Sequence, residues 1–192
     1  MALRYFWQMG KQSQALLIKR MTQLGEDAMN YAFELSFRSQ RIPYSGTWTH
    51  QTHNLADSFA SAVYVNGELQ RDSIRYVFKT PQSNKTGTYD LKTGRQAVND
   101  YLERIHPRAE RGDVTVIVVA AMYYTKYLEA GTYGRGGGNP PIKVVSGARD
   151  YIDRNYWAYV YDIYKRWELP RPNAKVIKGD QMGVYDYYHA RA

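Results

Sequence analysis

One long amphipathic segment near the N-terminus constrains the fold of this chain more than any other feature. From Lys11 to about Arg38, apolar residues recur at alternating steps of four and three, at Leu17, Met21, Leu24, Ala28, Tyr31 and Leu35. This spacing predicts one apolar face on a helix of about seven turns. Gly25 costs such a helix roughly 1 kcal/mol relative to alanine and is a candidate for a bend, but the helical pattern resumes after it, so we expect the helix to continue.

A β-hairpin is expected next, after a polar loop that contains Pro43 and runs to about Asn54. The segment 55–65 ends in a β-rich run, and Asn66-Gly67 follows it. This dipeptide is typical of a two-residue hairpin turn because both residues tolerate positive φ. Residues 73–80 alternate in polarity and predict the returning half-buried strand, with Ile74, Tyr76 and Phe78 on one side and Arg75, Val77 and Lys79 on the other.

Three further elements are indicated in the second half of the chain. A short amphipathic helix is predicted from about Arg95 to Ile105, before Pro107. The run 114–121, VTVIVVAA, is apolar throughout, which predicts a central strand covered on both faces. A closing helix is expected over 146–167, with apolar positions at Ala148, Ile152, Tyr156, Tyr159, Val160, Ile163 and Trp167.

These elements predict a single α+β domain over residues 1–169, with an antiparallel or mixed sheet packed by the long N-terminal helix and the C-terminal helix. A chain of 192 residues fits one such domain. Residues 81–112, which include the short helix, are interpreted as an insertion. Residues 170–192 begin with two prolines, Pro170 and Pro172, show no clear helical period beyond them and are interpreted as an extended C-terminal arm.

The composition favours a binding or assembly role. A net charge of +8 and a pI near 9.5 assist contact with phosphates or acidic proteins. The 19 tyrosines provide large amphipathic contact area of the kind enriched in protein interfaces. The absence of cysteine excludes disulfides, thiolate zinc sites and cysteine nucleophiles. No apolar run is long enough for a membrane span or a secretion signal, so neither is expected.

Two sequence patterns are candidate ligand sites, and each has a simpler explanation. The glycines of 134–141, GRGGGNPP, could direct backbone N–H groups at a phosphate, but the spacing matches neither a P-loop nor a dinucleotide loop. A flexible connection or an assembly loop is favoured. His50 and His53 are three residues apart in a segment that is predicted to be a loop, which favours surface or interface histidines over metal ligands.

Candidate catalytic residues are equally isolated. Ser58 and Ser61 lack the context of a nucleophile elbow, and Glu129 has no recognisable partner, so a structural ion pair or a cap is favoured for it. The tyrosines and basic residues of 151–166 could stack on and bind nucleic acid, but Tyr156 and Tyr159 fit an apolar helix face, which favours packing. We therefore expect no catalytic residue, no cofactor and no metal site.

Two short boxes, in a fixed order, carry a resemblance to a known family. The first is Thr52-His53-Asn54-Leu55 with Ser58, and the second is 123–132, YYTKYLEAGT, before the last helix. They resemble the T-G-N-L-x-x-S and Y-A-x-Y-V-E-x-G-T patterns of phage neck and minor tail proteins, often called tail-completion or head–tail joining proteins. The resemblance spans residues 11–167 without 81–112. His53 replaces the usual glycine, so the turn before Leu55 need not use positive φ.

The resemblance implies a structural virion protein of a tailed bacteriophage, made in the host cytoplasm, that forms a homo-oligomeric ring in the neck between portal and tail. Its partners would be copies of itself and other portal, neck and tail proteins, with non-specific contact to passing DNA. The glycine loop and the arm after Pro170 would reach adjacent rings. Assembly contacts are expected at Thr52, Asn54, Leu55, Ser58, Tyr124, Tyr127, Glu129, Gly131, Gly136, Gly137 and Gly138.

Two other functions remain open from the sequence. A basic nucleic-acid-binding module is suggested by the pI and by the basic, aromatic C-terminal segment. A hydrolase that uses Glu129 and a histidine is the third hypothesis.

Overall fold

The computed structural model describes residues 2–3, 9–38, 57–77, 93–105, 107, 113–122, 125 and 145–172. In chain order, the elements are β1 (Ala2–Leu3), α1 (Lys11–Arg38), β2 (Phe59–Val65), β3 (Glu68–Tyr76), α3 (Gly94–Arg104), β4 (Val114–Ala120) and α5 (Ser146–Arg166). The strands form one sheet in the order β1-β4-β2-β3, and each neighbouring pair is antiparallel. The α+β prediction is confirmed, and the sheet formed by the described strands is antiparallel.

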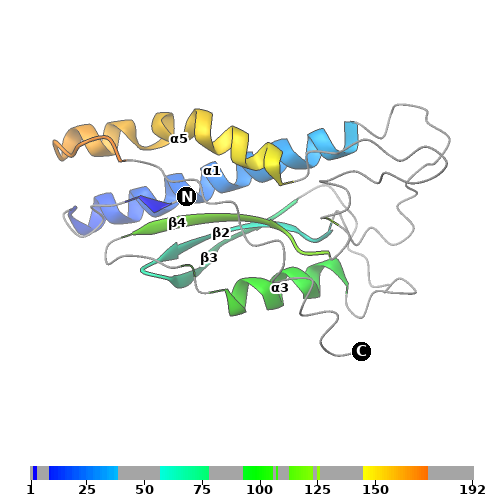
Figure 1. Cartoon of the computed structure of the whole chain (residues 1–192). Coiled ribbons are helices and arrows are strands. Elements are labelled where there is room, and N and C mark those ends of the chain that lie inside the picture. Colours follow the sequence, from blue (N-terminus) through cyan, green and yellow to red (C-terminus); the bar gives the residue numbers. More distant parts are fainter. Residues whose placement is uncertain are drawn as a thin grey trace.

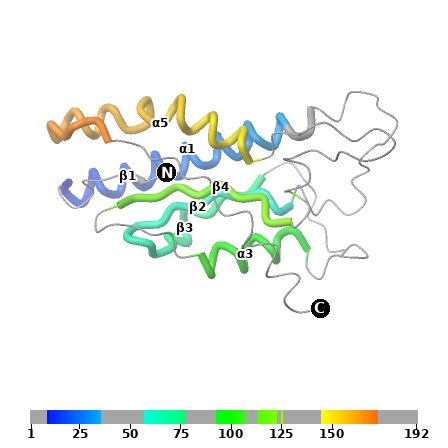
Figure 2. The backbone as a smooth tube through the Cα atoms, in the orientation of Figure 1, coloured from blue at the N-terminus to red at the C-terminus, as the bar shows by residue number. Residues whose placement is uncertain are grey.

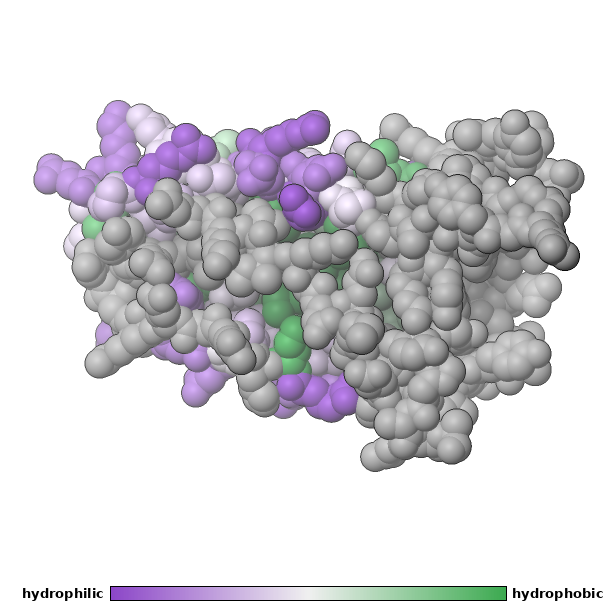
Figure 3. Space-filling model, viewed as in Figure 1, coloured by the Kyte–Doolittle hydropathy of each residue, from purple (hydrophilic) through white to green (hydrophobic). Residues whose placement is uncertain are grey.

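The helices cover both faces of the sheet (Figure 1). α1 crosses one face, α3 covers the other, and α5 lies along α1 (Figure 2). In the view of Figure 3, hydrophilic side chains gather over α5 and over α3, and apolar residues show between these two helices. The core contains the predicted seam of α1, where Leu17, Met21, Leu24 and Ala28 are fully buried.

Gly25 is explained by close packing and not by a bend. α1 is one continuous helix over its 28 residues. A Cβ atom on Gly25 would lie 3.1 Å from both side-chain atoms of Ser61 and from Cγ1 of Val116, in the two central strands. The missing side chain therefore lets α1 approach the sheet at its centre, which offsets the lower helix propensity of glycine.

The hairpin prediction is confirmed at its turn and corrected at its second strand. Asn66 and Gly67 have φ values of 53° and 83°, as a two-residue hairpin turn requires. β3, however, begins directly after the turn at Glu68 and not at Ser73. The Ser73 hydroxyl accepts a hydrogen bond from the Val63 N–H (2.8 Å) and donates one to the Gln70 carbonyl (2.6 Å), where the register between β2 and β3 shifts. This side chain completes a bulge that interrupts the alternation.

The other predicted elements are also present. β4 is central, paired with β1 and β2, as expected for its apolar sequence. α3 begins with a capping box between Thr93 and Gln96, and its Val98 and Leu102 are buried in the core. The Tyr64 hydroxyl, from β2, donates to the Leu102 carbonyl at 2.7 Å. The interpretation of 81–112 as an insertion stays a prediction. α3, which lies within this range, packs against the sheet.

α5 is antiparallel to α1 and is joined to it partly by polar contacts. The Trp167 indole N–H donates to Ser13 Oγ (2.8 Å), the Tyr159 hydroxyl donates to Asp27 Oδ2 (2.5 Å), and Gly147 faces Ala32 across the pair. Two residues expected on apolar faces, Tyr31 and Trp167, are each 39% exposed. They lie at the margin of the helix pair, where an aromatic ring can pack on one side and remain in water on the other.

Candidate assembly surface

Three long connections are rooted at one end of the domain. We call it the loop end: α1, β3 and β4 end there, and β2, α3 and α5 begin there. Phe33 of α1 packs edge-to-face on Phe59, with ring centroids 5.7 Å apart, and Phe59 pairs with Ala120 across the sheet. Ala60 pairs with Tyr76, and the guanidinium of Arg95 in α3 lies 3.6 Å from the Tyr76 ring centroid. The elements that flank three long connections therefore meet at the loop end. These connections are residues 39–56, 78–92 and 123–144.

The two family-like boxes are brought together at their roots. The Ala121 N–H donates to the Ser58 carbonyl at 3.2 Å, which joins the end of the first box to the residue two positions before Tyr123. Ser58, Ala121 and Met122 are buried, and the Thr125 N–H donates to the Met122 carbonyl at 3.0 Å. The antiparallel pairing of β2 with β4 makes this juxtaposition. Nothing in the local sequence of either box indicates it.

Among the expected contact residues, the structure describes only Ser58. Its exposed fraction is 0%, so its side chain belongs to the core of the domain. Its role in assembly stays a prediction. The remaining expected contacts lie outside the described residues: Thr52, Asn54, Leu55, Tyr124, Tyr127, Glu129, Gly131, Gly136, Gly137 and Gly138.

The structure places two of the candidate catalytic residues, Ser58 and Ser61. Ser61, like Ser58, is buried, and it faces Gly25 of α1 where a substrate cannot reach it. Within the described ranges, no group of three or more His, Asp or Glu residues could hold a metal ion. The four histidines, His50, His53, His106 and His189, and the glycine loop lie outside these ranges.

We call the described residues the framework of the domain. The net positive charge of the chain does not lie on this framework. The described residues include 13 of the 26 Lys and Arg residues and 13 of the 18 Asp and Glu residues, so their charges cancel. The other residues hold 13 basic and 5 acidic residues, which accounts for the whole net charge of +8. Of these, 7 basic and 2 acidic residues belong to the three connections rooted at the loop end.

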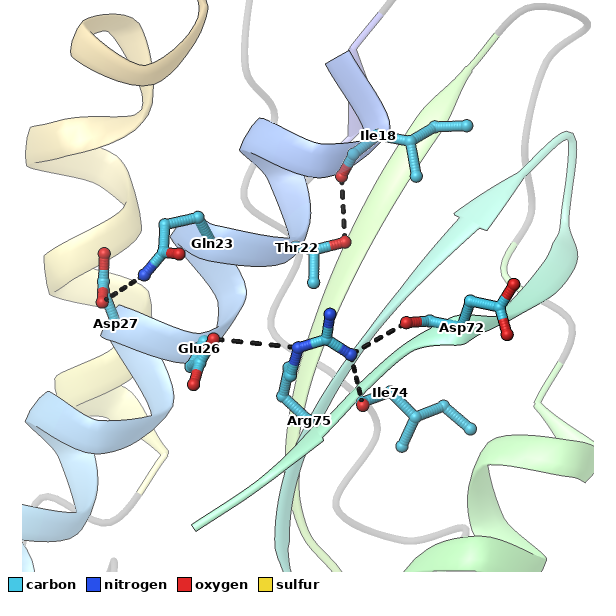
Figure 4. Close-up of polar contacts among 8 residues, drawn as sticks. All are labelled: Ile18, Thr22, Gln23, Glu26, Asp27, Asp72, Ile74 and Arg75. Carbon is cyan, nitrogen blue, oxygen red and sulfur yellow. Dashed lines mark hydrogen bonds and ion pairs between the residues drawn. The ribbon is translucent and has the colours of Figure 1, made fainter. Parts of the chain in front are cut away.

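Several cations of the framework lie beside carboxylates. Arg20 is 3.9 Å from Asp162, and Arg71 is 3.0 Å from Glu103. Arg75 lies 3.8 Å from Glu26 of α1 and donates to the Asp72 and Ile74 carbonyls, at 2.8 and 2.9 Å (Figure 4). Such contacts lower the positive field that these residues present to a polyanion.

Two tyrosine hydroxyls each join two elements of the framework: Tyr159 joins α5 to α1, and Tyr64 joins β2 to α3. Burial raises the pKa of Tyr159, and its hydrogen bonds with Asp27 and Tyr151 raise it further. Asp27 also accepts a hydrogen bond from Gln23 at 3.0 Å (Figure 4). Burial is likewise the main cause that raises the pKa of Tyr64, with smaller effects from Tyr101 and Glu103. Both hydroxyls remain protonated donors at neutral pH.

The aromatic face of α5 is used mostly for packing, as expected. Tyr156, Ile163 and Tyr164 are buried. The outward Tyr161 has the Lys165 ammonium 5.6 Å from its ring centroid, and Trp157 has the Arg171 guanidinium 5.3 Å from one of its rings. Each of these rings therefore already has a basic side chain of this chain beside it.

Sequence reasoning missed Arg171 and Pro172, which it placed in an extended arm. The structure folds both back onto α5, where Pro172 is buried and Arg171 stays exposed. The only local signal is the pair of prolines around Arg171, which restricts the backbone but does not reveal where it packs.

Comparisons with family models, with curated proteins and with solved structures each found no match. Within the described residues, no helix combines the length and the apolar character needed to cross a membrane.

Proposed function

We propose that this chain is a structural virion protein of a tailed bacteriophage, which forms a ring in the neck or tail connector between portal and tail. The observation that supports the proposal most strongly is the hydrogen bond between Ala121 and Ser58. It joins Ser58, the last residue of the first box, to Ala121, two residues before the second box, although more than sixty residues separate them in sequence.

The division between framework and connections fits an assembly role. A closed ring needs two different side surfaces on each subunit, and long connections from one end of a rigid domain can reach a neighbour without disturbing the core. The buried roots Ser58, Ala121 and Met122 would hold the connections in place on the framework. Tyrosine-rich connections would then supply contact area at low entropic cost.

The decisive experiment is to find the protein in purified particles of a tailed phage that encodes it. Mass spectrometry of intact virions and immunogold labelling should place the chain at the junction of head and tail. Absence from infectious particles would disprove the proposal. Mass measurement of the isolated chain at rising concentration would then give the number of subunits if the ring forms without its platform.

Substitutions in the second box test the same proposal at the level of residues. Tyr127→Ala and Glu129→Ala should prevent incorporation into particles while leaving the unfolding temperature of the isolated chain unchanged. Ala15→Ser, on an exposed position of α1, is a matched control that should incorporate normally. Normal incorporation of both box variants would remove the second box from the assembly contacts.

A second candidate, a nucleic-acid-binding module, is favoured by the distribution of charge. The excess of basic residues lies in the connections and chain ends and not on the framework. Binding to short duplex DNA should then weaken steeply with salt, since each phosphate contact releases condensed counterions. Charge reversal of Lys79 and Lys85 should reduce the salt dependence, whereas reversal of Lys19 on α1 should not. Salt-independent binding, or none at near-physiological salt, would reject this function.

A further inference from the structure

Directly after α5, the chain reverses and runs back beside the helix. Glu168 adopts a positive φ of 50°, a left-handed conformation that commonly ends helices. The Leu169 N–H donates to the Tyr164 carbonyl at 3.0 Å, and the Glu168 N–H donates to the Lys165 carbonyl at 3.1 Å. The reversal therefore places the next residues against the middle of α5.

Arg171 and Pro172 are then held by two aromatic residues of α5. The Arg171 Nε–H donates to the Tyr156 hydroxyl at 3.2 Å, and this hydroxyl donates to the Pro172 carbonyl at 3.3 Å. The guanidinium lies 5.3 Å from a ring centroid of Trp157 and 5.6 Å from that of Tyr156. A cation over an aromatic face is attracted by the ring, so three contacts converge on one side chain.

We propose that Arg171 is a positioning residue: with Tyr156 and Trp157 it forms a clasp that makes residues 173–192 leave the domain beside the middle of α5. Without the clasp, only the backbone hydrogen bonds of Glu168 and Leu169 would hold the chain beside the end of α5. The role of this segment as an arm that reaches an adjacent ring rests on the proposed function, but the clasp itself does not.

The clasp changes where such an arm begins. Tyr156 precedes Trp167 by 11 residues, which is roughly 16 Å along the helix axis, and its hydroxyl binds Arg171 and Pro172. The reversal therefore moves the base of the segment back along α5 by part of this length. This displacement is directed towards the loop end, because α5 begins there.

Trypsin cleavage after Lys175 in the isolated full chain tests the clasp. A protease must bind several residues before the scissile bond in extended form, so Arg171 and Pro172 must first detach from α5. Arg171→Ala and Tyr156→Phe should accelerate this cleavage roughly three- to tenfold, because the rate follows the detached population. The Arg171-Pro172 bond resists trypsin because proline follows, so the first variant removes no competing site.

Two further variants make the test specific. Lys165→Ala removes a similar cation from a neighbouring ring, that of Tyr161, and should leave cleavage after Lys175 at the wild-type rate. Arg171→Lys keeps the charge but loses the planar guanidinium, and should restore less than half of the protection. Equal rates for Arg171→Ala and Lys165→Ala would overturn the clasp, as would full protection in Arg171→Lys.

Unfolding temperature and the rates of cleavage at other lysines report whether a variant has simply loosened the fold, and Tyr156→Phe provides a second probe if Arg171→Ala does so. The assay needs no assembly partner. Failure of the clasp would therefore appear as unchanged cleavage, whereas failure of the proposed function would appear as absence of the wild-type chain from virions.

Discussion

The loop end of the domain and the opposite end, which we call the turn end, reverse the chain in different ways. At the turn end, Asn66 and Gly67 connect β2 to β3 directly, and the Asn66 N–H donates to the Asp113 carbonyl at 3.0 Å. A Cβ atom on Gly67 would lie 3.2 Å from the Pro107 carbonyl oxygen, so the connection into β4 also packs closely there. At the loop end, Ser58 and Ala121 bind each other through the backbone and then lead into long connections.

The turn end and the loop end are therefore suited to different roles, one in stabilising the fold and the other in contact with partners. A reversal of two residues tolerates little change in sequence, because its backbone angles are fixed by the strands that it joins. Long surface connections tolerate change and carry binding residues in many proteins. The charge follows the same division, since the described framework is neutral and the connections are basic. We therefore expect the roots and the turn to control stability and the connections to control contact.

The largest effect is expected at a root of the loop end. Phe59→Ala should lower the free energy of unfolding by about 3–5 kcal/mol, the usual cost of removing a buried aromatic ring. Phe59 is buried and its ring packs on Phe33. Urea unfolding followed by circular dichroism measures the loss, with Gln12→Ala on the exposed side of α1 as the control. A loss below about 1 kcal/mol would mean that the roots do not carry stability.

The second effect concerns the turn end. Gly67→Val should cost about 2–3 kcal/mol, because Val is strained at a φ of 83° and its Cβ would approach the Pro107 carbonyl. Asn66→Gly is the matched control and should change stability by less than about 0.5 kcal/mol, since glycine adopts positive φ readily. Equal stabilities of the two variants in urea would contradict the view that the turn is constrained.

A smaller effect, dependent on pH, is expected where β2 meets α3. Tyr64→Phe should cost about 1–2 kcal/mol at neutral pH, because the Leu102 carbonyl loses its buried donor. Since the fold raises the pKa of Tyr64, its contribution is present below the ordinary value of 10.0 and is lost as pH rises above it, where the unfolded chain ionises first. Urea titrations from pH 8 to 11 should therefore show a shallower decline for the variant. Identical slopes would refute this linkage.

The smallest effect on stability is expected in a connection of the loop end. Deletion of Gly136 to Gly138 should change the free energy of unfolding by less than about 0.5 kcal/mol, because loop-closure entropy varies slowly with length. Under the proposed function, the same deletion should abolish incorporation into particles. A large loss of stability in the isolated chain would instead mean that this glycine segment is part of the folded framework.

Local sequence was sufficient to predict most elements of the framework. The apolar spacing from Leu17 to Leu35 predicts α1, Asn66-Gly67 predicts the turn, and the apolar run from Val114 predicts the central strand β4. Each of these signals is contained within a few turns or residues, where periodicity and φ preferences act directly. The candidate boxes were also visible in the sequence, but their contact residues, apart from Ser58, lie outside the described residues.

Contacts between residues far apart in sequence explain the features that the local sequence did not predict. Gly25 was interpreted from helix propensity, yet its place depends on Ser61 and Val116, which come from other elements. The start of β3 was misplaced because Ser73 stabilises a bulge through Val63, a residue of the neighbouring strand. The sequence by itself determined which segments become helices, strands and turns. Only the tertiary structure decided that two boxes share one root and that Arg171 returns to α5, because backbone pairing and side-chain contacts between remote residues leave no local pattern.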